Sequence, residues 1–399
     1  MPIREVDCVI IGGGAAGLMC AAAAGQRGRS VVVLDHANKV GKKILMSGGG
    51  RCNFTNLFAT PANYLSGNPH FCKSALSRYT QHDFIALVEK HGVPYHEKTL
   101  GQLFCDRKSR DILDLLLAEC ADVGAEVWTD CAVQRIRRHD AGFDLHTALG
   151  DYRCPSLVIA TGGLSIPRMG ATGFGYQVAK QFGLKLTPRE AALVPFTLKG
   201  RLLSLAQGLA GVALPVIAEC RGQRFPEALL FTHKGLSGPA ILQVSNYWHP
   251  GDPVQIDFLP GQDLAALISE WRADGSRAEL STRLSRLMPK GFVQAWLSHH
   301  GLESALAGKH LADLSQADVS RLCDAFQRWT CVPDGTEGYA TAEVTRGGVD
   351  TAEVSSKTFE ARSVPGLYFI GEVLDVTGWL GGYNFQWAWA SGWCAGQYV

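Results

Sequence analysis

The chain of 399 residues carries a formal net charge of +1, and 46% of its residues are hydrophobic. This length accommodates two or three domains with full cores. The near-neutral charge gives no general attraction to a polyanion, so we do not expect nucleic acid as a partner. The twelve cysteines include no C-x-x-C pair, and no Cys/His set has zinc spacing. The composition therefore indicates no metal site and favours a reduced, cytoplasmic protein.

An apolar stretch follows Arg4 and reaches Ala24, as it does in a signal peptide. Asp7 and three glycines interrupt this stretch, and it is too broken to span a bilayer. No other segment approaches transmembrane length, so we expect no membrane contact.

The same N-terminal residues predict a strand, a glycine turn, a helix and a second strand. Val6 to Ile11 is a continuous apolar run with β-branched residues, which is typical of a strand buried on both faces. The alanine-rich segment from Ala15 to Arg27 favours a helix, and Ser30 to Leu34 is a second apolar run. This order is the βαβ unit of a parallel sheet.

The turn between the first strand and the helix carries the motif Gly12-x-Gly14-x-x-Gly17. In such a turn Gly12 permits the tight bend, Gly14 lets a pyrophosphate reach the backbone, and Gly17 lets helix and strand pack closely. The pyrophosphate then lies at the positive end of the helix. Asp35 ends the second strand, where it can accept a hydrogen bond from a ribose 2′-hydroxyl. These residues predict dinucleotide binding, and the acid disfavours NADP at this site.

The middle of the chain contains helical and short alternating patterns before its texture changes. An apolar run from Ser156 to Ala160 has the character of a buried parallel strand and ends in Thr161-Gly162-Gly163. From about Thr187, β-like pieces broken by Gly and Pro precede a mostly helical stretch. The predicted helices are 82–91 and 109–123, and the predicted short strands are 127–129, 133–137, 143–147, 214–220 and 254–258.

The region 188–335 does not resemble the opening βαβ unit, so we interpret it as an inserted substrate or cap domain. Apolar strand texture resumes at 366–371, and a helix rich in Ala and Trp is predicted for 382–396. The predicted fold class is α/β. It is a discontinuous Rossmann-type domain of residues 1–187 and 336–399, interrupted by the insert.

The C-terminal part indicates which dinucleotide to expect. Gly366-Leu-Tyr-Phe-Ile-Gly371-Glu372, with Gly381-Gly382-Tyr383-Asn384 before a helix, resembles the closing motif of the glutathione-reductase-type FAD superfamily. The resemblance implies a strand end beside the ribityl and phosphate groups, and a helix whose positive end faces the flavin. The turn Ala160-Thr161-Gly162-Gly163 resembles that superfamily's second FAD-contacting turn. Three motifs in this order favour FAD over NAD.

Longer motifs are similar to the YhiN-like (BaiN-type) bacterial family of NAD(P)/FAD-dependent oxidoreductases, with matches from residue 3 to the C-terminus. The resemblance implies an FAD domain interrupted by a β-barrel-plus-helices insert. Phe174 and Trp379 depart from the family pattern, so no member's substrate is carried over. The segments that carry the resemblance are Lys42 to Asn56, Phe231 to Pro239, Thr345 to Val349 and Gly371 to Ala388.

Three residues are candidates for catalysis: Arg51 to tune the flavin by its charge, His233 to give a substrate a proton, and Tyr383 at the start of the last helix. Their alternatives are a solvent-facing loop residue for Arg51 and a turn histidine satisfied by backbone for His233. For Cys52, packing is favoured over thiol chemistry because no partner cysteine is close in sequence. The residues expected to contact the cofactor are Gly12, Gly14, Ala15, Ala16, Gly17, Asp35, His36, Lys43, Ser47, Gly49, Gly50, Arg51, Cys52, Asn53, Val133, Thr161, Gly162, Gly163, Gly371, Glu372, Asp375, Gly382, Tyr383 and Asn384.

The leading interpretation is an FAD-dependent oxidoreductase that transfers a hydride between the flavin and a small organic substrate. Only one complete dinucleotide fingerprint is present, so NAD(P)H is left open as a transient electron donor. The first alternative is an FAD-dependent RNA-modifying enzyme, which also uses one fingerprint. The second is a non-enzymatic flavin-bound scaffold or sensor. The sequence leaves the oligomeric state open.

Overall fold

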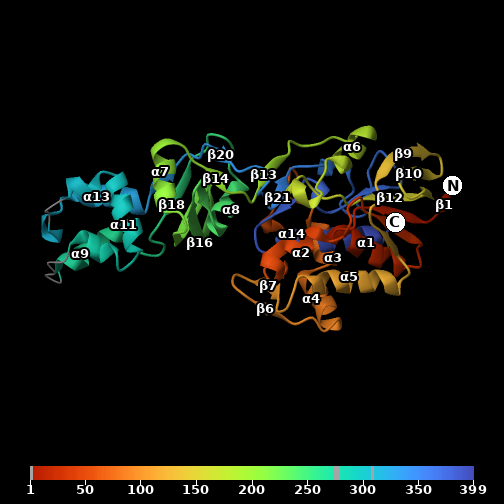
Figure 1. The fold of residues 1–399 in the computed structure, drawn as a ribbon, viewed down its shortest axis with the longest axis horizontal. Coiled ribbons are helices and arrows are strands. Elements are labelled where there is room, and N and C mark those ends of the chain that lie inside the picture. Colours follow the sequence, from red (N-terminus) through yellow and green to blue (C-terminus); the bar gives the residue numbers. More distant parts are fainter. Residues whose placement is uncertain (1–2, 274–278, 307–309) are drawn as a thin grey trace. The chain divides into compact units, whose positions relative to one another are not determined.

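The computed structural model describes residues 3–273, 279–306 and 310–399, and the chain divides into two compact units (Figure 1). The first unit contains Met1–Ala191 and Glu343–Val399, and the second contains Ala192–Ala342. The domain borders predicted from the sequence, at 187/188 and 335/336, lie a few residues before the points where the chain passes from one unit to the other, at 191/192 and 342/343. A substrate-covering role for the second unit stays a prediction.

The core of the first unit is a five-stranded parallel sheet in the order β22-β12-β2-β3-β8. Strands β2 (Cys8–Ile11) and β3 (Val31–Leu34) are apolar and buried at every position, as predicted for strands covered on both faces. The outer strands are β12 (Ser156–Ile159), β22 (Leu367–Phe369) and β8 (Glu126–Trp128). Strand β8 was predicted among the short alternating strands, and it pairs in parallel with β3 at the edge of this sheet.

Helix α1 (Ala15–Gly25) and helix α14 (Tyr383–Gly396) pack directly on one another. Glycines permit this approach: a methyl group on Gly392 would lie 2.4 Å from the Ala16 carbonyl oxygen. The predicted helix at 109–123 is α5 (Arg110–Asp122), which also packs on α1. The layer of α1 and α14 therefore brings the first and last motifs of the sequence together.

Two smaller sheets lie beside this core. The predicted strands 133–137 and 143–147 belong to a four-stranded sheet in the order β1-β11-β10-β9. A three-stranded sheet, β4-β7-β6, was not predicted because strands of three or four residues are too short for their alternation to be recognised. The strands of both are β1 (Arg4–Glu5), β11 (Asp151–Cys154), β10 (Gly142–Thr147), β9 (Val133–His139), β4 (Asn53–Asn56), β7 (Gln102–Cys105) and β6 (Tyr95–Glu97).

The remaining elements of the first unit are short helices, turns and bridges. They are α2 (Lys42–Gly50), η1 (Pro61–Asn63), β5 (Tyr64–Leu65), α3 (Lys73–Arg78), α4 (Gln81–Lys90), η2 (Pro167–Met169), α6 (Phe174–Gln181), β13 (Glu190–Ala192), β21 (Val344–Arg346), η4 (Thr351–Glu353), η5 (Gly371–Val373) and β23 (Thr377–Gly378).

The second unit combines a seven-stranded antiparallel sheet with helices, where the resemblance implied a β-barrel plus helices. Its seven strands have the order β19-β18-β15-β16-β17-β14-β20. The strands are β14 (Phe196–Thr197), β15 (Ala213–Cys220), β16 (Gln223–Thr232), β17 (Gly235–Ser237), β18 (Val254–Asp257), β19 (Trp329–Cys331) and β20 (Gly335–Thr336). The helices are α7 (Gly200–Gly208), α8 (Pro239–Ser245), α9 (Leu264–Ala273), α10 (Leu280–Leu284), α11 (Lys290–His299), α12 (Leu302–Ala305), η3 (Leu311–Asp313) and α13 (Gln316–Phe326).

The cysteines behave as small core residues: all twelve are free and buried. Within the described part of the chain, no helix is long and apolar enough to cross a membrane. Across the same residues, no group of three or more His, Cys, Asp or Glu side chains is placed to hold a metal ion.

The close contact between α1 and α14 predicts that a side chain added at Gly392 destabilises the protein. Gly392→Val should lower the free energy of unfolding by about 1–3 kcal/mol, because the new side chain would collide with the Ala16 backbone. Gly291→Val in α11 is the matched control, since a Cβ there meets no atom within 4 Å. Urea titrations followed by tryptophan fluorescence measure both variants, and equal losses in the two would contradict the packing argument.

Candidate functional site

The glycine turn after β2 has the geometry that a dinucleotide-binding turn requires. Gly12 has a φ of +111°, and a methyl group on it would lie 2.4 Å from the Ala160 carbonyl oxygen. A methyl group on Gly17 would lie 1.9 Å from the Gly12 carbonyl oxygen. A Cβ on Gly14, by contrast, would meet no atom within 4 Å. Gly12 and Gly17 thus serve close packing, whereas Gly14 leaves open space before the helix.

Helix α1 begins at this open space with its backbone donors available. Among the described residues no side chain caps the helix at Gly14. The N–H groups of the first turn, with Ala15 and Ala16 among them, therefore carry the positive end of the helix dipole. An anionic pyrophosphate is the kind of group that such an end binds.

Asp35 holds the glycine turn as well as ending β3. Its two carboxylate oxygens accept hydrogen bonds from the backbone N–H groups of Gly13 and Ala37, both at 2.8 Å. His36 is exposed beside it. Val133 begins β9 two residues after Cys131, whose N–H donates to the Asp35 carbonyl oxygen at 2.9 Å. The predicted ribose side of the site is therefore assembled around the end of β3.

The loop after α2 offers a second group of backbone donors. The helical part of α2 stops at Ser47, whose ψ is 150°, and Gly48 and Gly49 then adopt left-handed conformations. Side chains at Gly49 and Gly50 would meet no atom within 4 Å. Successive N–H groups in such a turn form a concave anion-binding surface. Arg51 follows, exposed and without a carboxylate partner among the described residues.

Cys52 and Asn53 are held inside the fold. Cys52 is fully buried with a φ of +43°, and burial raises the pKa of its thiol well above the ordinary range. A neutral, enclosed thiol supports the packing interpretation rather than thiol chemistry. The Asn53 side-chain amide lies 3.2 Å from the Gln102 amide, and the Asn53 oxygen would lie 2.9 Å from a Cβ on Gly382.

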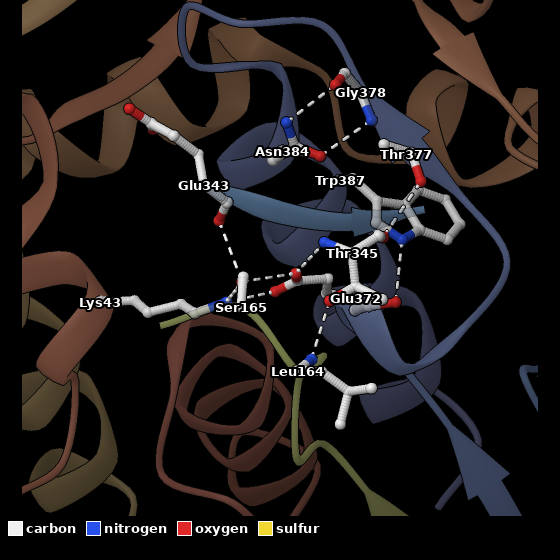
Figure 2. Close-up of polar contacts among 11 residues, drawn as sticks. Lys43, Leu164, Ser165, Glu343, Thr345, Glu372, Thr377, Gly378, Asn384 and Trp387 are labelled. Carbon is white, nitrogen blue, oxygen red and sulfur yellow. Dashed lines mark hydrogen bonds and ion pairs between the residues drawn. The ribbon is translucent and has the colours of Figure 1, made fainter. Parts of the chain in front are cut away.

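Lys43 and Glu372 form an ion pair at the centre of the site (Figure 2). Lys43 Nζ lies 2.8 Å from Glu372 Oε2 and donates to Ser165 Oγ at 2.6 Å. The backbone N–H of Thr345 donates to Glu372 Oε1 at 2.9 Å. Thr345 Oγ1 in turn accepts from the Leu164 N–H at 2.8 Å. The carboxylate is thus held by three segments that are distant in sequence, at Lys43, Ser165 and Thr345.

Ser165 was missed in the sequence, and Thr345 was noticed only as part of a motif. Ser165 stands two residues beyond Thr161-Gly162-Gly163 and is fully buried, yet an isolated serine has no distinguishing spacing. The Thr161 hydroxyl at the same strand end is buried and has no hydrogen-bond partner among the described residues. A buried hydroxyl of this kind needs a partner, and a bound cofactor can supply one.

The closing motif is fixed by helix α14. The Gly371 N–H donates to Ser391 Oγ at 3.0 Å, and Trp387 Nε1 donates to the Gly371 carbonyl oxygen at 3.1 Å. Asn384 bridges back to Gly378: it accepts from the Gly378 N–H at 2.8 Å and donates to its carbonyl oxygen at 3.0 Å (Figure 2). Trp387 and Trp389 of this helix are buried in the core.

Helix α14 begins at Gly382, in a left-handed conformation with φ of +95°. No side chain caps it among the described residues, so its positive end is available as at α1. The Tyr383 carbonyl oxygen accepts a hydrogen bond from the Tyr64 hydroxyl at 2.9 Å, and its ring is buried. Gly382 and Tyr383 lie where the resemblance implies that the helix faces the flavin.

Asp375 lies between the two parts of the closing motif. It is buried, and Oδ2 accepts a hydrogen bond from the Gly67 N–H at 2.9 Å. Burial raises the pKa of the Asp375 carboxyl, against the opposing effect of that hydrogen bond. Compared with a free carboxyl group, Asp375 is therefore harder to ionise.

His233 belongs to the second unit, whereas the other two catalytic candidates belong to the first. It is exposed in the turn between β16 and β17 of the second unit, and its carbonyl oxygen accepts from Gln207 Nε2 at 3.3 Å. The proposed catalytic roles of His233, Arg51 and Tyr383 stay predictions.

The residues of the first unit fit FAD. The open space at Gly14, the uncapped starts of α1 and α14, and the unpartnered Thr161 hydroxyl provide what a dinucleotide needs. They lie on the segments that the sequence motifs indicated.

A family model described as the HI0933-like protein Rossmann domain matches residues 6–398. A ribosomal RNA dihydrouridine synthase of Escherichia coli (strain K12) is 54% identical over 396 residues, covering 99% of this chain and 98% of the relative. The protein of that name from Haemophilus influenzae is 51% identical over 388 residues, covering 96% of both chains. A 3-dehydro-bile acid delta(4,6)-reductase of Clostridium scindens is 29% identical over 408 residues, covering 97% of both.

Solved structures show the same fold at low sequence identity. A quinol-fumarate reductase has a TM-score of 0.53 and 17% identity, covering 100% of this chain and 71% of the other. A 3-ketosteroid-delta4-(5alpha)-dehydrogenase of Rhodococcus jostii RHA1 has a TM-score of 0.50 and 16% identity, covering 98% and 97%.

The family match spans nearly the whole chain and agrees with the dinucleotide cradle, and it sets aside the non-enzymatic scaffold. The chain belongs to the HI0933-like family of FAD-binding Rossmann proteins and is an FAD-dependent oxidoreductase.

Proposed function

We propose that this protein is a dihydrouridine synthase that acts on ribosomal RNA. The observation that carries the proposal is the identity of 54% and 51% to two enzymes of that name, over nearly the full length of every chain compared. Bound FAD, once reduced by an electron donor, would supply the hydride that saturates the double bond between C5 and C6 of a uracil. The first alternative from the sequence, an RNA-modifying flavoenzyme, thus becomes the leading function.

The expectation that nucleic acid is not a partner is not supported by these relatives. It rested on the formal net charge of +1, which sums every charge of the chain. Contacts to phosphate need only a few cations at suitable positions. The net charge of the whole chain does not report the local potential of such a group.

Saturation of a carbon–carbon double bond needs a proton as well as a hydride, and we assign the proton to Asp375. The support is its burial, its raised pKa and its place between Gly371 and Gly382 in the closing motif. The hydrogen bond from the Gly67 N–H leaves its second oxygen to carry a proton.

The electron donor in this proposal is a nicotinamide dinucleotide that binds transiently. The chain has one complete dinucleotide fingerprint, which the FAD occupies, so the donor would have no Rossmann domain of its own. A donor that leaves after each hydride transfer needs only an open approach to the flavin.

A second candidate function is the reduction of a small unsaturated ketone. The 29% identity to a bile acid reductase over 97% of both chains favours it, and it matches the small organic substrate inferred from the sequence. Both candidates share the hydride chemistry and differ in the molecule that approaches the flavin.

The deciding experiment incubates the purified, flavin-loaded protein with unmodified ribosomal RNA and NADH or NADPH. Nucleoside mass spectrometry should then detect dihydrouridine, as uridine that has gained two hydrogen atoms. A parallel reaction with an unsaturated 3-keto steroid tests the second candidate. Reduction of the steroid without any change in RNA would reject the proposed function in favour of the second.

Gly14→Val should abolish FAD retention without unfolding the protein. Gly14 has φ −89° and ψ −169°, a conformation that any residue adopts, and its Cβ would enter the open space before α1. Only the pyrophosphate would meet the valine. Gly208→Val, also free of neighbours, is the control. Flavin absorbance per protein measures occupancy, and a fully loaded, yellow Gly14→Val protein would refute the cradle.

Asp375→Asn should lower the rate of uridine reduction about a hundredfold or more with FAD occupancy unchanged. An asparagine oxygen can still accept from the Gly67 N–H, but the amide cannot give up a proton. In the native enzyme the rate should fall as pH rises through the raised pKa, since the acid must be protonated. This decrease of the rate with rising pH should be absent in Asp375→Asn. Exposed Asp122→Asn is the control, and an unchanged pH profile in Asp375→Asn would exclude Asp375 as the donor.

A further inference from the structure

Two of the most exposed large apolar side chains of the first unit lie side by side. Phe58 is 61% exposed and Leu100 is 53% exposed. The Leu57 N–H donates to the Gly101 carbonyl oxygen at 2.8 Å, which joins the two loops that carry them. We call this pair the Phe58–Leu100 tip. Phe58 follows β4, and Leu100 belongs to the turn between β6 and β7, two strands labelled at the lower edge of the first unit in Figure 1. Exposed apolar groups held together in this way mark a contact surface.

Unpaired cations accompany the tip along the three-stranded sheet. Lys98, two residues before Leu100, lies over the Phe104 ring at 5.3 Å. Lys108 follows the far end of β7. Neither has a carboxylate partner among the described residues, and both are exposed.

The acids near these lysines have hydrogen-bond or ion-pair partners of their own. Asp106 contacts His96 at 2.6 Å, and Arg107 pairs with Asp111 at 3.0 Å. Glu97 accepts a hydrogen bond from the Gly101 N–H at 3.1 Å. Lys98 and Lys108 are therefore not engaged by these carboxylates, and each ammonium can meet a phosphate of an RNA backbone.

Asn56 ties the tip to the start of α14. Its buried amide donates to the Leu100 carbonyl oxygen at 3.1 Å and to the Gly381 carbonyl oxygen at 2.9 Å. Its oxygen accepts from the Phe58 N–H at 2.9 Å. One side chain thus fixes both halves of the tip to the glycine turn that opens the flavin-facing helix. A ligand held at the tip is held at a fixed place relative to that turn.

We propose that the Phe58–Leu100 tip and Lys98 dock the RNA substrate, with Phe58 stacked on a base near the target uridine. The inference rests on the proposed function. A uracil that meets a flavin has to leave its stack, and exposed aromatic side chains compensate for lost stacking. The ammonium of Lys98 then meets the adjoining phosphate. The aromatic and cationic composition favours RNA over a protein partner for this surface.

The test uses the flavin-loaded protein and unmodified ribosomal RNA. Phe58→Ala should weaken RNA binding about tenfold and raise KM, with the flavin still reduced by the nicotinamide at the native rate. Phe58→Tyr should restore binding, because a phenol ring stacks as a phenyl ring does. Lys98→Gln should make the slope of log affinity against log salt less steep by about 0.7, the loss of one contact to a single strand.

Matched controls lie on another sheet of the same unit. Leu149→Ala removes an exposed apolar side chain beyond β10, and Arg137→Gln removes an exposed cation of β9. Both should bind RNA as the native protein does. Native binding and KM in Phe58→Ala and Lys98→Gln, with active native enzyme, would overturn the docking surface alone.

The other outcomes separate the two proposals. If the native enzyme forms no dihydrouridine, the proposed function fails first. If Phe58→Ala changes the oligomeric state in light scattering while RNA binding is kept, the tip is a protein contact and the inference is rejected.

Discussion

The first unit depends on one carboxylate that several distant segments share. Glu372 receives Lys43 from the start of α2, the Thr345 N–H from β21, and Ser165 from the turn after β12. Loss of this group would leave donors unsatisfied in a largely buried place, at about 1–3 kcal/mol each. These segments also carry the cofactor motifs. The interaction that stabilises the junction therefore also sets the shape of the cradle.

Helix α14 gives the same junction its rigidity by presenting a different surface on each side. Gly392 faces α1, where only a hydrogen atom fits, while Trp387 packs among Phe71 and Phe359 and donates to the Gly371 carbonyl oxygen. This explains a helix rich in both glycine and tryptophan. It also explains how the first unit can contain an insertion of 151 residues, Ala192–Ala342, while the segments on both sides of it contribute to one sheet. The last helix supplies contacts that the parallel strands alone do not.

The sequence predicted the features that depend on neighbours in the chain. The strand at Cys8–Ile11, the glycine turn and Asp35 follow from local hydrophobicity and spacing, and the structure has them there. It could not predict Ser165, Asn56 or Gly67, because their importance comes from partners more than a hundred residues away or from a backbone N–H. The three-stranded sheet of β4, β7 and β6 was missed for a related reason: its strands are stabilised by pairing across loops rather than by a long pattern.

The net charge is a poor guide to binding partners for a related reason. In the proposed cradle an anionic cofactor would be attracted mainly by backbone donors, at the uncapped starts of α1 and α14 and in the left-handed turn at Gly48 and Gly49. These partial charges appear in no count of lysine and arginine, and they act at short range in a place shielded from water. An anionic cofactor therefore uses few formal cations, and the remaining ones are free to act elsewhere on the surface. A protein of this construction can bind a dinucleotide and a polyanion while its formal charges nearly cancel.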